Sequence, residues 1–296
     1  MKIDTHQHFW LYHASDFPWI DDTMTVLRRD CMPGLHAGAI HAAGIGAVVA
    51  VQARNMTAET DFLLQLAERH PEVAGVVGWA DLAAADLDRR LDTWCAHPAF
   101  KGLRHILQDE PDVPAWVDAP GITRGMRVLQ QRQRVYDVLV FEHQLSAVAG
   151  FCARHDAHWL VLDHVGKPAL RDWDRRDGPA PRRWSRDLRG LAALPHVMCK
   201  LSGVVTETGR SARQGLTPQD RENILACFDE ALAAFGPQRL MYGSDWPVCE
   251  LVAPYEVVHG LADQWATSRL SPQEQQAFWC GNAMRCYGLD MPAREP

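Results

Sequence analysis

The sequence has few of the features that mark exported, membrane-bound or nucleic-acid-binding proteins. Its first residues contain no apolar signal core, and no stretch approaches the roughly 18 apolar residues that suggest a membrane span. The formal net charge is −7, and the one basic run, 182–189, is interrupted by Trp184 and Asp187. Nucleic-acid and membrane surfaces usually carry clustered basic residues. We therefore expect neither a nucleic acid nor a membrane as partner.

Paired cysteine motifs, nucleotide-binding loops and linkers are absent as well. The eight cysteines form no CxxC pair, and scattered cysteines without an export signal indicate reduced thiols and a cytoplasmic protein. There is no GxGxxG, no P-loop, no internal repeat and no Gly/Ser linker. Since α/β barrels often reach this length in one piece, we expect residues 1–296 to form a single domain.

The positive signal is an alternation of short apolar runs with helical patterns. Segments between the runs carry apolar residues at spacings of three and four, as amphipathic helices do. Several runs are apolar throughout, which suits parallel strands covered on both faces. Eight strands alternating with helices favour a (β/α)8 TIM barrel. The eight expected strands are 3–8, 47–53, 75–80, 100–105, 137–142, 158–164, 197–202 and 239–245.

Three long connections follow expected strands, at 107–124, 166–184 and 203–217. In a barrel, the segment after each strand lies at the C-terminal face, where barrel active sites are found. We expect these extended loops to form the rim of a pocket, although each could instead be a variable surface loop.

Ionisable residues end most of the expected strands. Such groups are costly to bury unless they are paired or used, and barrel topology brings them to one rim. His6 and His8 lie two apart on the first strand, so both imidazoles point to the same side and could bind a metal. The other candidates are Arg104 and His105, Glu142 and His143, Asp163 and His164, Lys200, and Asp245.

The layout resembles the amidohydrolase superfamily, and five phrases resemble its lactonase branch. That branch includes L-fuconolactonases, L-rhamnonolactonases and 2-pyrone-4,6-dicarboxylate lactonase. The resemblance runs from Ile3 to about Tyr287, and its motifs are specific in combination. They are DTHQHFW (4–10), KGLRH (101–105), LDHVGKP (162–168), KLSG (200–203) and YGSDWP (242–247).

The resemblance implies a metal site and a mechanism. It implies that one divalent metal can be held by His6, His8, His143 and Asp245. It also implies that His164 contacts the attacking water or the substrate carbonyl, and that Asp245 takes a proton from the water. A carboxylate is ionised at neutral pH and can orient water, so Asp245 suits this role on chemical grounds too.

The remaining polar candidates are assigned to the oxyanion and the substrate. We expect His164 and Lys200, with or without a metal, to stabilise the oxyanion, and Asp245 to pass its proton to the leaving ring oxygen. Arg104 and Glu142 are expected to bind substrate hydroxyls or a carboxylate. For Trp246, next to Asp245, a place in the pocket is favoured over a role as core filler.

One departure from metal-rich relatives concerns the fourth strand, which ends in Arg104 and His105 and offers no carboxylated lysine or bridging glutamate. A binuclear centre is therefore not expected. Two options stay open, namely one zinc or manganese ion or catalysis without a metal, because a lactone is an easier electrophile than an amide.

The expected function is hydrolysis of a sugar lactone, such as an L-fucono-lactone, to its aldonic acid. A lactonase for pyrone or muconolactone carboxylates is a second candidate, and it would need several converging arginines. Arg54 and Arg124 are the residues that could join Arg104 there. The same layout would also suit a metal-dependent decarboxylase or a binding protein without activity. The oligomeric state is not predicted.

Overall fold

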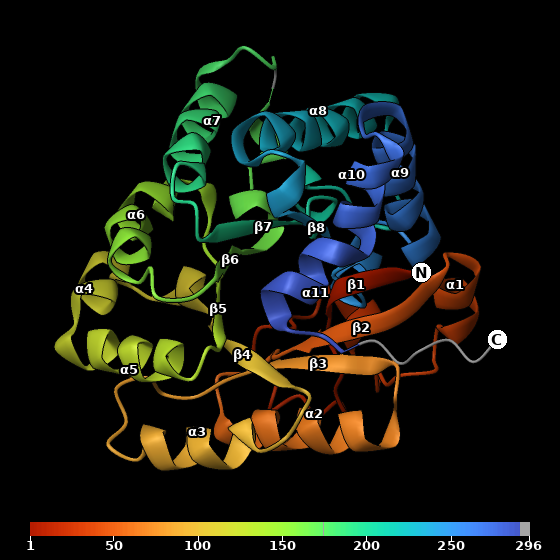
Figure 1. The fold of residues 1–296 in the computed structure, drawn as a ribbon. Helices are drawn as coiled ribbons and strands as arrows, with labels where there is room; N and C mark the ends of the chain where they lie inside the picture. Colours follow the sequence, from red (N-terminus) through yellow and green to blue (C-terminus); the bar gives the residue numbers. More distant parts are fainter. Residues whose placement is uncertain (174, 291–296) are drawn as a thin grey trace.

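The computed structural model describes residues 1–173 and 175–290. Its eight strands form one parallel sheet in sequential order, and Figure 1 shows them at the centre of a ring of helices. The strands are β1 (Lys2–Gln7), β2 (Ile45–Val51), β3 (Val73–Gly78), β4 (Phe100–His105), β5 (Val135–Val138), β6 (Leu160–Leu162), β7 (Val197–Leu201) and β8 (Leu240–Tyr242).

All eight expected strands are present, and the (β/α)8 barrel is confirmed. β1 contacts β8, and a parallel bridge between Gln7 and Trp246, which follows β8, closes the barrel. The expected boundaries differ most at the fifth strand, which ends at Val138 instead of residue 142.

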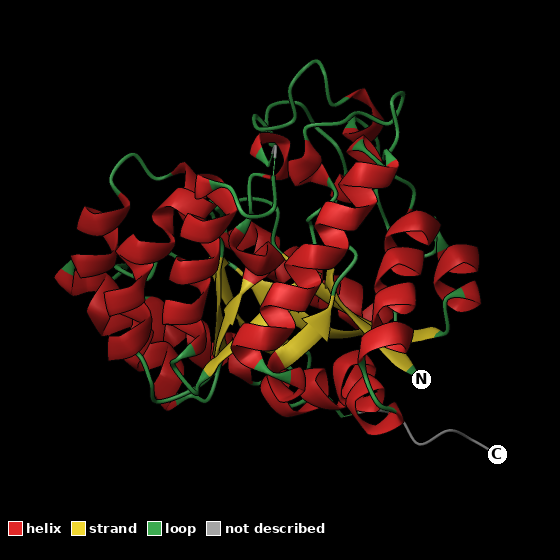
Figure 2. Cartoon of the chain, turned by 90° about the horizontal axis from the view of Figure 1, so that it is seen from above, coloured by secondary structure: helices red, strands yellow, loops and turns green. Residues whose placement is uncertain are grey.

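The helices cover the outside of the sheet, and loops gather on one side of the molecule (Figure 2). Proline in the first turn and capping side chains start several helices. The Thr217 hydroxyl, for example, accepts a hydrogen bond from the Asp220 N–H at the start of α8. The helices are α1 (Ala37–Ala42), α2 (Thr57–Arg69), α3 (Leu87–Cys95), α4 (Val113–Asp118), α5 (Pro120–Gln131), α6 (Leu145–Arg154), α7 (Pro179–Ala192), α8 (Pro218–Phe235), α9 (Tyr255–Arg269), α10 (Pro272–Gln276) and α11 (Asn282–Tyr287).

The barrel interior has an apolar layer below a charged one. Because side chains alternate along a strand, residues two apart on β5, β6 and β7 share the inner face. On β5 and β7 an apolar residue is followed by an ionisable one nearer the C-terminal end, and at β6 the ionisable residue comes directly after the strand. The pairs are Val135 and Asp137, Val161 and Asp163, and Met198 and Lys200, all fully or almost fully buried.

The C-terminal residues close the other end of the barrel. Tyr287 of α11 and Leu289 pack against the apolar interior layer, and α11 lies over the barrel opening in Figure 1. The interior is thus sealed below, and the charged layer faces the C-terminal opening. Among the described residues, no helix combines the length and hydrophobicity that crossing a membrane requires.

Candidate active site

Closure of the barrel brings Asp245 next to the two histidines of β1. The Asp245 N–H donates to the His6 carbonyl at 2.9 Å, and the His8 N–H donates to the Trp246 carbonyl at 2.8 Å. Asp245 Oδ1 then lies 3.3 Å from His8 Nε2 and 3.7 Å from His6 Nε2. His164 Nε2 approaches the same oxygen to 3.9 Å. Three imidazoles thus surround one carboxylate.

Left-handed backbone conformations place two of these side chains. Asp245 has φ +60° and His164 has φ +54°, a region in which a residue other than glycine is held at a cost of about 1–3 kcal/mol. Gly203, at φ +63°, leaves room for the His164 ring, which a Cβ atom at this position would overlap. Strain of this kind often marks functional sites.

Hydrogen bonds fix how His164 is protonated. Burial lowers the pKa of its imidazole to about 4, so the ring is neutral at pH 7. Its Nδ1 is 2.9 Å from the Ser202 hydroxyl, which can donate to it. Its Nε2 lies 3.9 Å from Asp245 Oδ1, and we assign the hydrogen to Nε2 because a carboxylate only accepts. His164 therefore presents an N–H donor beside Asp245.

Asp245 is held ionised by its neighbours. Burial would raise its pKa, but His164, the hydrogen bond with His8 and the nearby His6 outweigh that effect and lower the pKa well below the usual range. The carboxylate is therefore available as a base at neutral pH.

The charged layer lies directly beneath His6. Lys200 Nζ is 2.5 Å from Asp137 Oδ2 and 3.1 Å from Asp163 Oδ1, and Arg104 Nη1 is 3.0 Å from Asp163 Oδ2. Burial lowers the pKa of Lys200, but Asp137 and Asp163 outweigh it and leave the pKa raised. The ammonium group is therefore charged, paired and fully buried.

His6 connects this layer to the site. Its Nε2 is 3.2 Å from Arg104 Nη1. Its Nδ1 is 3.2 Å from Lys200 Nζ and 3.4 Å from Asp163 Oδ1. Burial lowers the pKa of His6 well below its usual range, so the ring is neutral.

A cavity of about 360 Å³ opens above these groups. Ligand pockets for small molecules have volumes of about 300–1,000 Å³, so the space suits a compact ligand. His8, Arg104, His164 and Asp245 line its floor, and Gln108, Asp109, Lys167, Thr206 and Glu207 add polar walls. Trp19, Met24, Leu139, Val248 and Leu251 are among its apolar lining.

Besides His6, which lies beneath the cavity floor, four of the predicted site residues do not line this cavity. Lys200 is one layer below it. Glu142 accepts hydrogen bonds from the Ala169 N–H at 2.9 Å and Arg183 at 3.0 Å, so its carboxylate ties a loop to α7. Trp246 is fully buried and stacks on His36.

His143 is the fourth residue, and the early end of β5 explains its position. The chain leaves the barrel after Val138, which puts His143 in a short helix, η3 (Glu142–Gln144), with an exposed side chain stacked on Phe141. The apolar residues 139–141 continue the strand pattern in the sequence, which explains why a strand end was expected at His143. The structure does not bring His143 to the other proposed ligands.

Lys167 and Glu207 are lining residues that the sequence interpretation did not assign. Both lie in segments that it did single out, the motif 162–168 and the long connection 203–217. In the sequence, only the expected position of each segment at the rim indicated that Lys167 and Glu207 could line a pocket, because a lysine or a glutamate does not identify a pocket by itself.

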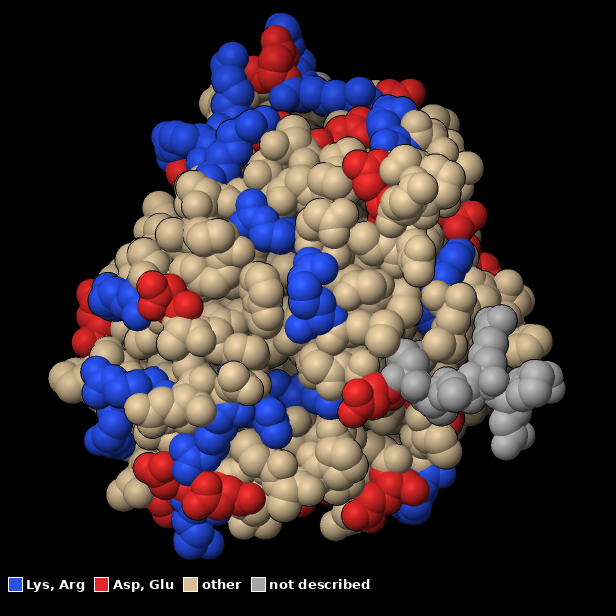
Figure 3. Space-filling model, viewed as in Figure 1, with Lys and Arg blue, Asp and Glu red and all other residues tan. Residues whose placement is uncertain are grey.

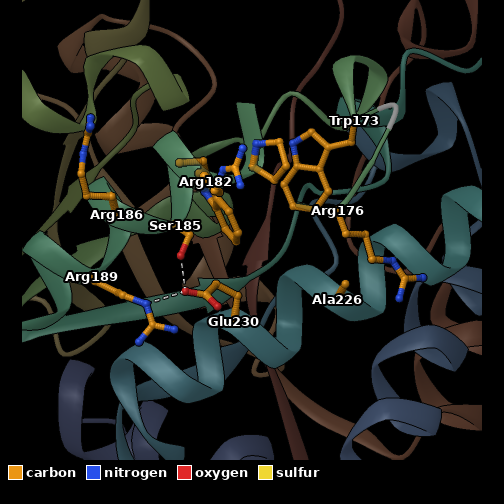
Figure 4. A pocket seen from close by; sticks show the side chains of 10 residues that line it. Trp173, Arg176, Arg182, Ser185, Arg186, Arg189, Ala226 and Glu230 are labelled. Carbon is orange, nitrogen blue, oxygen red and sulfur yellow. Dashed lines mark hydrogen bonds and ion pairs between the residues drawn. The ribbon is translucent and has the colours of Figure 1, made fainter. Parts of the chain in front are cut away.

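A second cavity, of about 520 Å³, lies between α7 and α8 and carries several arginines. Basic side chains gather over α7 (Figure 3), but in Figure 4 Arg176 and Arg186 point away from one another. Glu230 accepts from Ser185 at 2.5 Å and pairs with Arg189 at 2.7 Å. The carboxylate in this cavity is thus already paired within the protein.

The site chemistry suits one divalent ion. Donor atoms of His6, His164 and Asp245, all buried, lie within 4.8 Å of one another. His8 Nδ1 donates to the Val51 carbonyl at 2.8 Å, so its Nε2 presents a lone pair to Asp245 unless the ring is protonated. Zinc bonds of about 2.0–2.1 Å place tetrahedral ligand atoms about 3.3 Å apart, which matches the His8–Asp245 distance of 3.3 Å.

Comparisons with known proteins agree with this geometry. An L-fucono-1,5-lactonase of Burkholderia multivorans is 55% identical over 293 residues, which cover 99% of this chain and 98% of the relative. An L-fucono-1,5-lactonase of Burkholderia ambifaria is 30% identical, over 99% of this chain and 97% of the relative.

Solved structures and a family model extend the comparison. A crystal structure of an amidohydrolase from Burkholderia multivorans with bound zinc superposes with a TM-score of 0.94 at 54% identity, over 98% of this chain and all of that one. The model of the amidohydrolase family matches residues 3–289. The chain belongs to the amidohydrolase family.

Proposed function

We propose that this protein hydrolyses L-fucono-1,5-lactone or a closely related aldonolactone to the aldonic acid. The observation that carries the proposal is the Asp245 carboxylate, which lies among three imidazoles at the floor of a cavity of about 360 Å³. The 55% identity to an L-fucono-1,5-lactonase over nearly the full chain supports the substrate class.

The first step is attack of water on the lactone carbonyl. Asp245 orients the water and takes its proton, because the carboxylate is ionised and its oxygen faces the cavity floor. The His164 Nε2–H donates to the carbonyl oxygen as it becomes an oxyanion. Arg104, which also lines the cavity, adds positive charge on the same side.

The second step is opening of the ring. The tetrahedral intermediate collapses, the bond from the carbonyl carbon to the ring oxygen breaks, and Asp245 returns its proton to that oxygen. Protonated Asp245 is a strong enough acid for this transfer because its surroundings favour the ionised form. Water is consumed and the carboxylate is regenerated.

A divalent ion would be held by His6, His8 and Asp245, with His164 at its edge. When bound, zinc or manganese supplies Lewis-acid polarisation of the carbonyl and lowers the pKa of water. Val51 and Asp163 orient His8 and His6 through their other ring nitrogens, as the outer partners of metal-binding histidines do.

For Lys200 we propose a task other than stabilising the oxyanion. Its ammonium group neutralises Asp137 and Asp163 and so supports His6 from below. We propose that it positions the site without touching the substrate.

A lactone carrying two carboxylates fits this cavity less well. Of the arginines in the described residues, Arg104 lines the cavity, whereas Arg54 pairs with Asp16 and Glu59 and Arg124 donates to the Ala83 carbonyl.

We also propose that residues 1–296 act as one domain in the cytoplasm, where all eight cysteines, free in this structure, would stay reduced.

The test is acid release from purified protein incubated with a panel of aldono-lactones and with 2-pyrone-4,6-dicarboxylate. We expect the fastest turnover with L-fucono-1,5-lactone. Turnover of the pyrone alone, or of no lactone at all, would refute the proposal.

A further inference from the structure

Three charged side chains that line the cavity, Asp109, Lys167 and Glu207, have no role in the mechanism above, and the last two lie close together. Lys167 lies just after β6 and Glu207 lies in η6 (Thr206–Thr208), which follows β7. Both line the same cavity as His164 and Asp245. They come from neighbouring loops, so they form one polar wall.

The backbone holds Lys167 in a fixed position. His164, Val165 and Lys167 all have positive φ, between +47° and +54°, and the Lys167 N–H donates to the His164 carbonyl at 2.8 Å. The same tight turn therefore positions His164 and Lys167. The Lys167 ammonium lies 5.1 Å from the centre of the Phe141 ring, which leaves it half-buried.

Glu207 is equally well supported. Its N–H donates to the Val204 carbonyl at 3.2 Å, and the Thr206 hydroxyl donates to the Gly203 carbonyl at 2.7 Å. Gly209, at φ +68°, ends the short helix. The loop that leaves space for His164 at Gly203 thus also presents Glu207.

The Glu207 carboxylate lacks a full set of partners inside the protein. Its residue is 7% exposed, and across residues 1–173 and 175–290 no ion pair within 4.0 Å is formed with it. Burial raises the pKa of this carboxyl group by more than Lys167 and Arg171 lower it, so the pKa is raised overall. A buried carboxylate needs hydrogen bonds, and the cavity is the open side from which a ligand can supply them.

An apolar wall adjoins this polar one, and the segment 248–251 that contributes to it is in contact with η6. Trp19 and Met24 contribute from the segment after β1, and Val248 and Leu251 from the segment after β8. A polar wall beside an apolar one matches a deoxysugar lactone, which carries hydroxyls on its ring and a methyl group outside it. A lactone without hydroxyls would leave the Lys167 and Glu207 side chains unpaired.

We propose that Lys167 and Glu207 bind the ring hydroxyls of the lactone and give the enzyme its preference for polyhydroxylated substrates. Glu207 accepts hydrogen bonds from hydroxyls, and Lys167 donates to them. This inference rests on the proposed lactonase function and adds two specificity-determining residues to its site.

The test compares two lactones that share a six-membered ring and an exocyclic methyl group. L-Fucono-1,5-lactone carries ring hydroxyls, and δ-hexalactone carries none. For Glu207→Gln and Lys167→Met, we expect kcat/KM with the sugar lactone to fall about tenfold to a hundredfold, mainly through KM, as for loss of a charged hydrogen bond. With δ-hexalactone, kcat/KM should stay at the wild-type value.

A binding measurement keeps the test independent of turnover. Calorimetric titration with L-fuconate, the product that keeps the hydroxyls, should show about tenfold or greater weakening in both variants. Glu222→Gln, on the exposed surface of α8, is the matched control and should change neither measurement.

The outcomes separate the two proposals. Equal losses on both lactones, or unchanged kinetics and unchanged L-fuconate binding, would overturn the role of Lys167 and Glu207 while leaving the lactonase function intact. A wild-type protein without activity on L-fucono-1,5-lactone would overturn the lactonase function itself and this inference with it.

Discussion

Asp245 Oδ1 lies 3.3 Å from His8 Nε2, although the other ring nitrogen of His8, Nδ1, already donates its hydrogen to the Val51 carbonyl. A neutral His8 would thus turn a lone pair toward a carboxylate, which is unfavourable. The contact is complete only with a proton or a metal ion between the two atoms. The His8–Asp245 pair therefore links the proposed general base to the proposed binding of a metal ion.

Zinc binding should depend on His8 and not on His143. We expect metal-free protein to bind one zinc ion per chain in a calorimetric titration. His8→Ala should weaken that binding by at least about a hundredfold. It removes a ligand itself, and loss of a residue that only orients a ligand already lowers metal affinity about tenfold to a hundredfold. His143→Ala is the matched control, because its ring is exposed and stacks on Phe141. If His143→Ala lost zinc and His8→Ala kept it, the proposed ligand set would be wrong.

Replacement of Lys200 should lower the stability of the protein. Lys200→Met leaves Asp137 and Asp163 without the ammonium group that they share in the barrel interior. Removing one partner of a buried ion pair costs about 3–5 kcal/mol, so the free energy of unfolding in urea should fall by about that amount. Adding Asp137→Asn should recover part of the loss. A variant of unchanged stability with a raised KM would instead support direct substrate binding by Lys200.

Two glycines offer a test of how the His164 ring is placed. Gly203 and Gly215 have nearly equal φ values of +63° and +62°, but a Cβ atom would meet the His164 ring at Gly203 and nothing within 4 Å at Gly215. Both alanine variants should lose about 1 kcal/mol through backbone strain. We expect kcat to fall in Gly203→Ala alone, because the ring must move. Equal kcat values in the two variants would contradict this account of the site.

Stability should decrease as the pH falls from about 6.5 toward 4. Burial lowers the pKa of His155 and of His259 to about 4, whereas histidines of an unfolded chain titrate near about 6.5. In this window the unfolded chain binds more protons than the folded one, so protonation favours unfolding. The melting temperature should be lower at pH 5 than at pH 7.5, and His155→Leu should reduce the difference. A melting temperature that is constant over this range would contradict the prediction.

The barrel and most of the catalytic cluster could be predicted from the sequence. Strand periodicity and the strand-end positions placed His8, Arg104, His164 and Asp245 at one rim, and these four line the cavity. Periodicity shows which way a side chain points, but it does not show how deep in the barrel the residue lies. Lys200 points inward as expected, yet it lies in the layer below the cavity.

The other differences have similar physical causes. Residues 139–141 continue the apolar pattern of β5, so the sequence gives no sign that the chain leaves the barrel at Val138. This continuation explains why the sequence predicts Glu142 and His143 at the end of a strand, whereas the structure has them in a short helix. The position of the Glu207 side chain depends on how its loop packs against a neighbouring loop, and the local sequence pattern does not show this.

The most direct test of the account is the kcat/KM of Asp245→Asn with L-fucono-1,5-lactone, compared with wild type. Asparagine keeps the size of the side chain but cannot take a proton from water, so we expect a loss of about a thousandfold, with the melting temperature still showing a folded protein. Wild-type turnover by a folded Asp245→Asn protein would contradict the account.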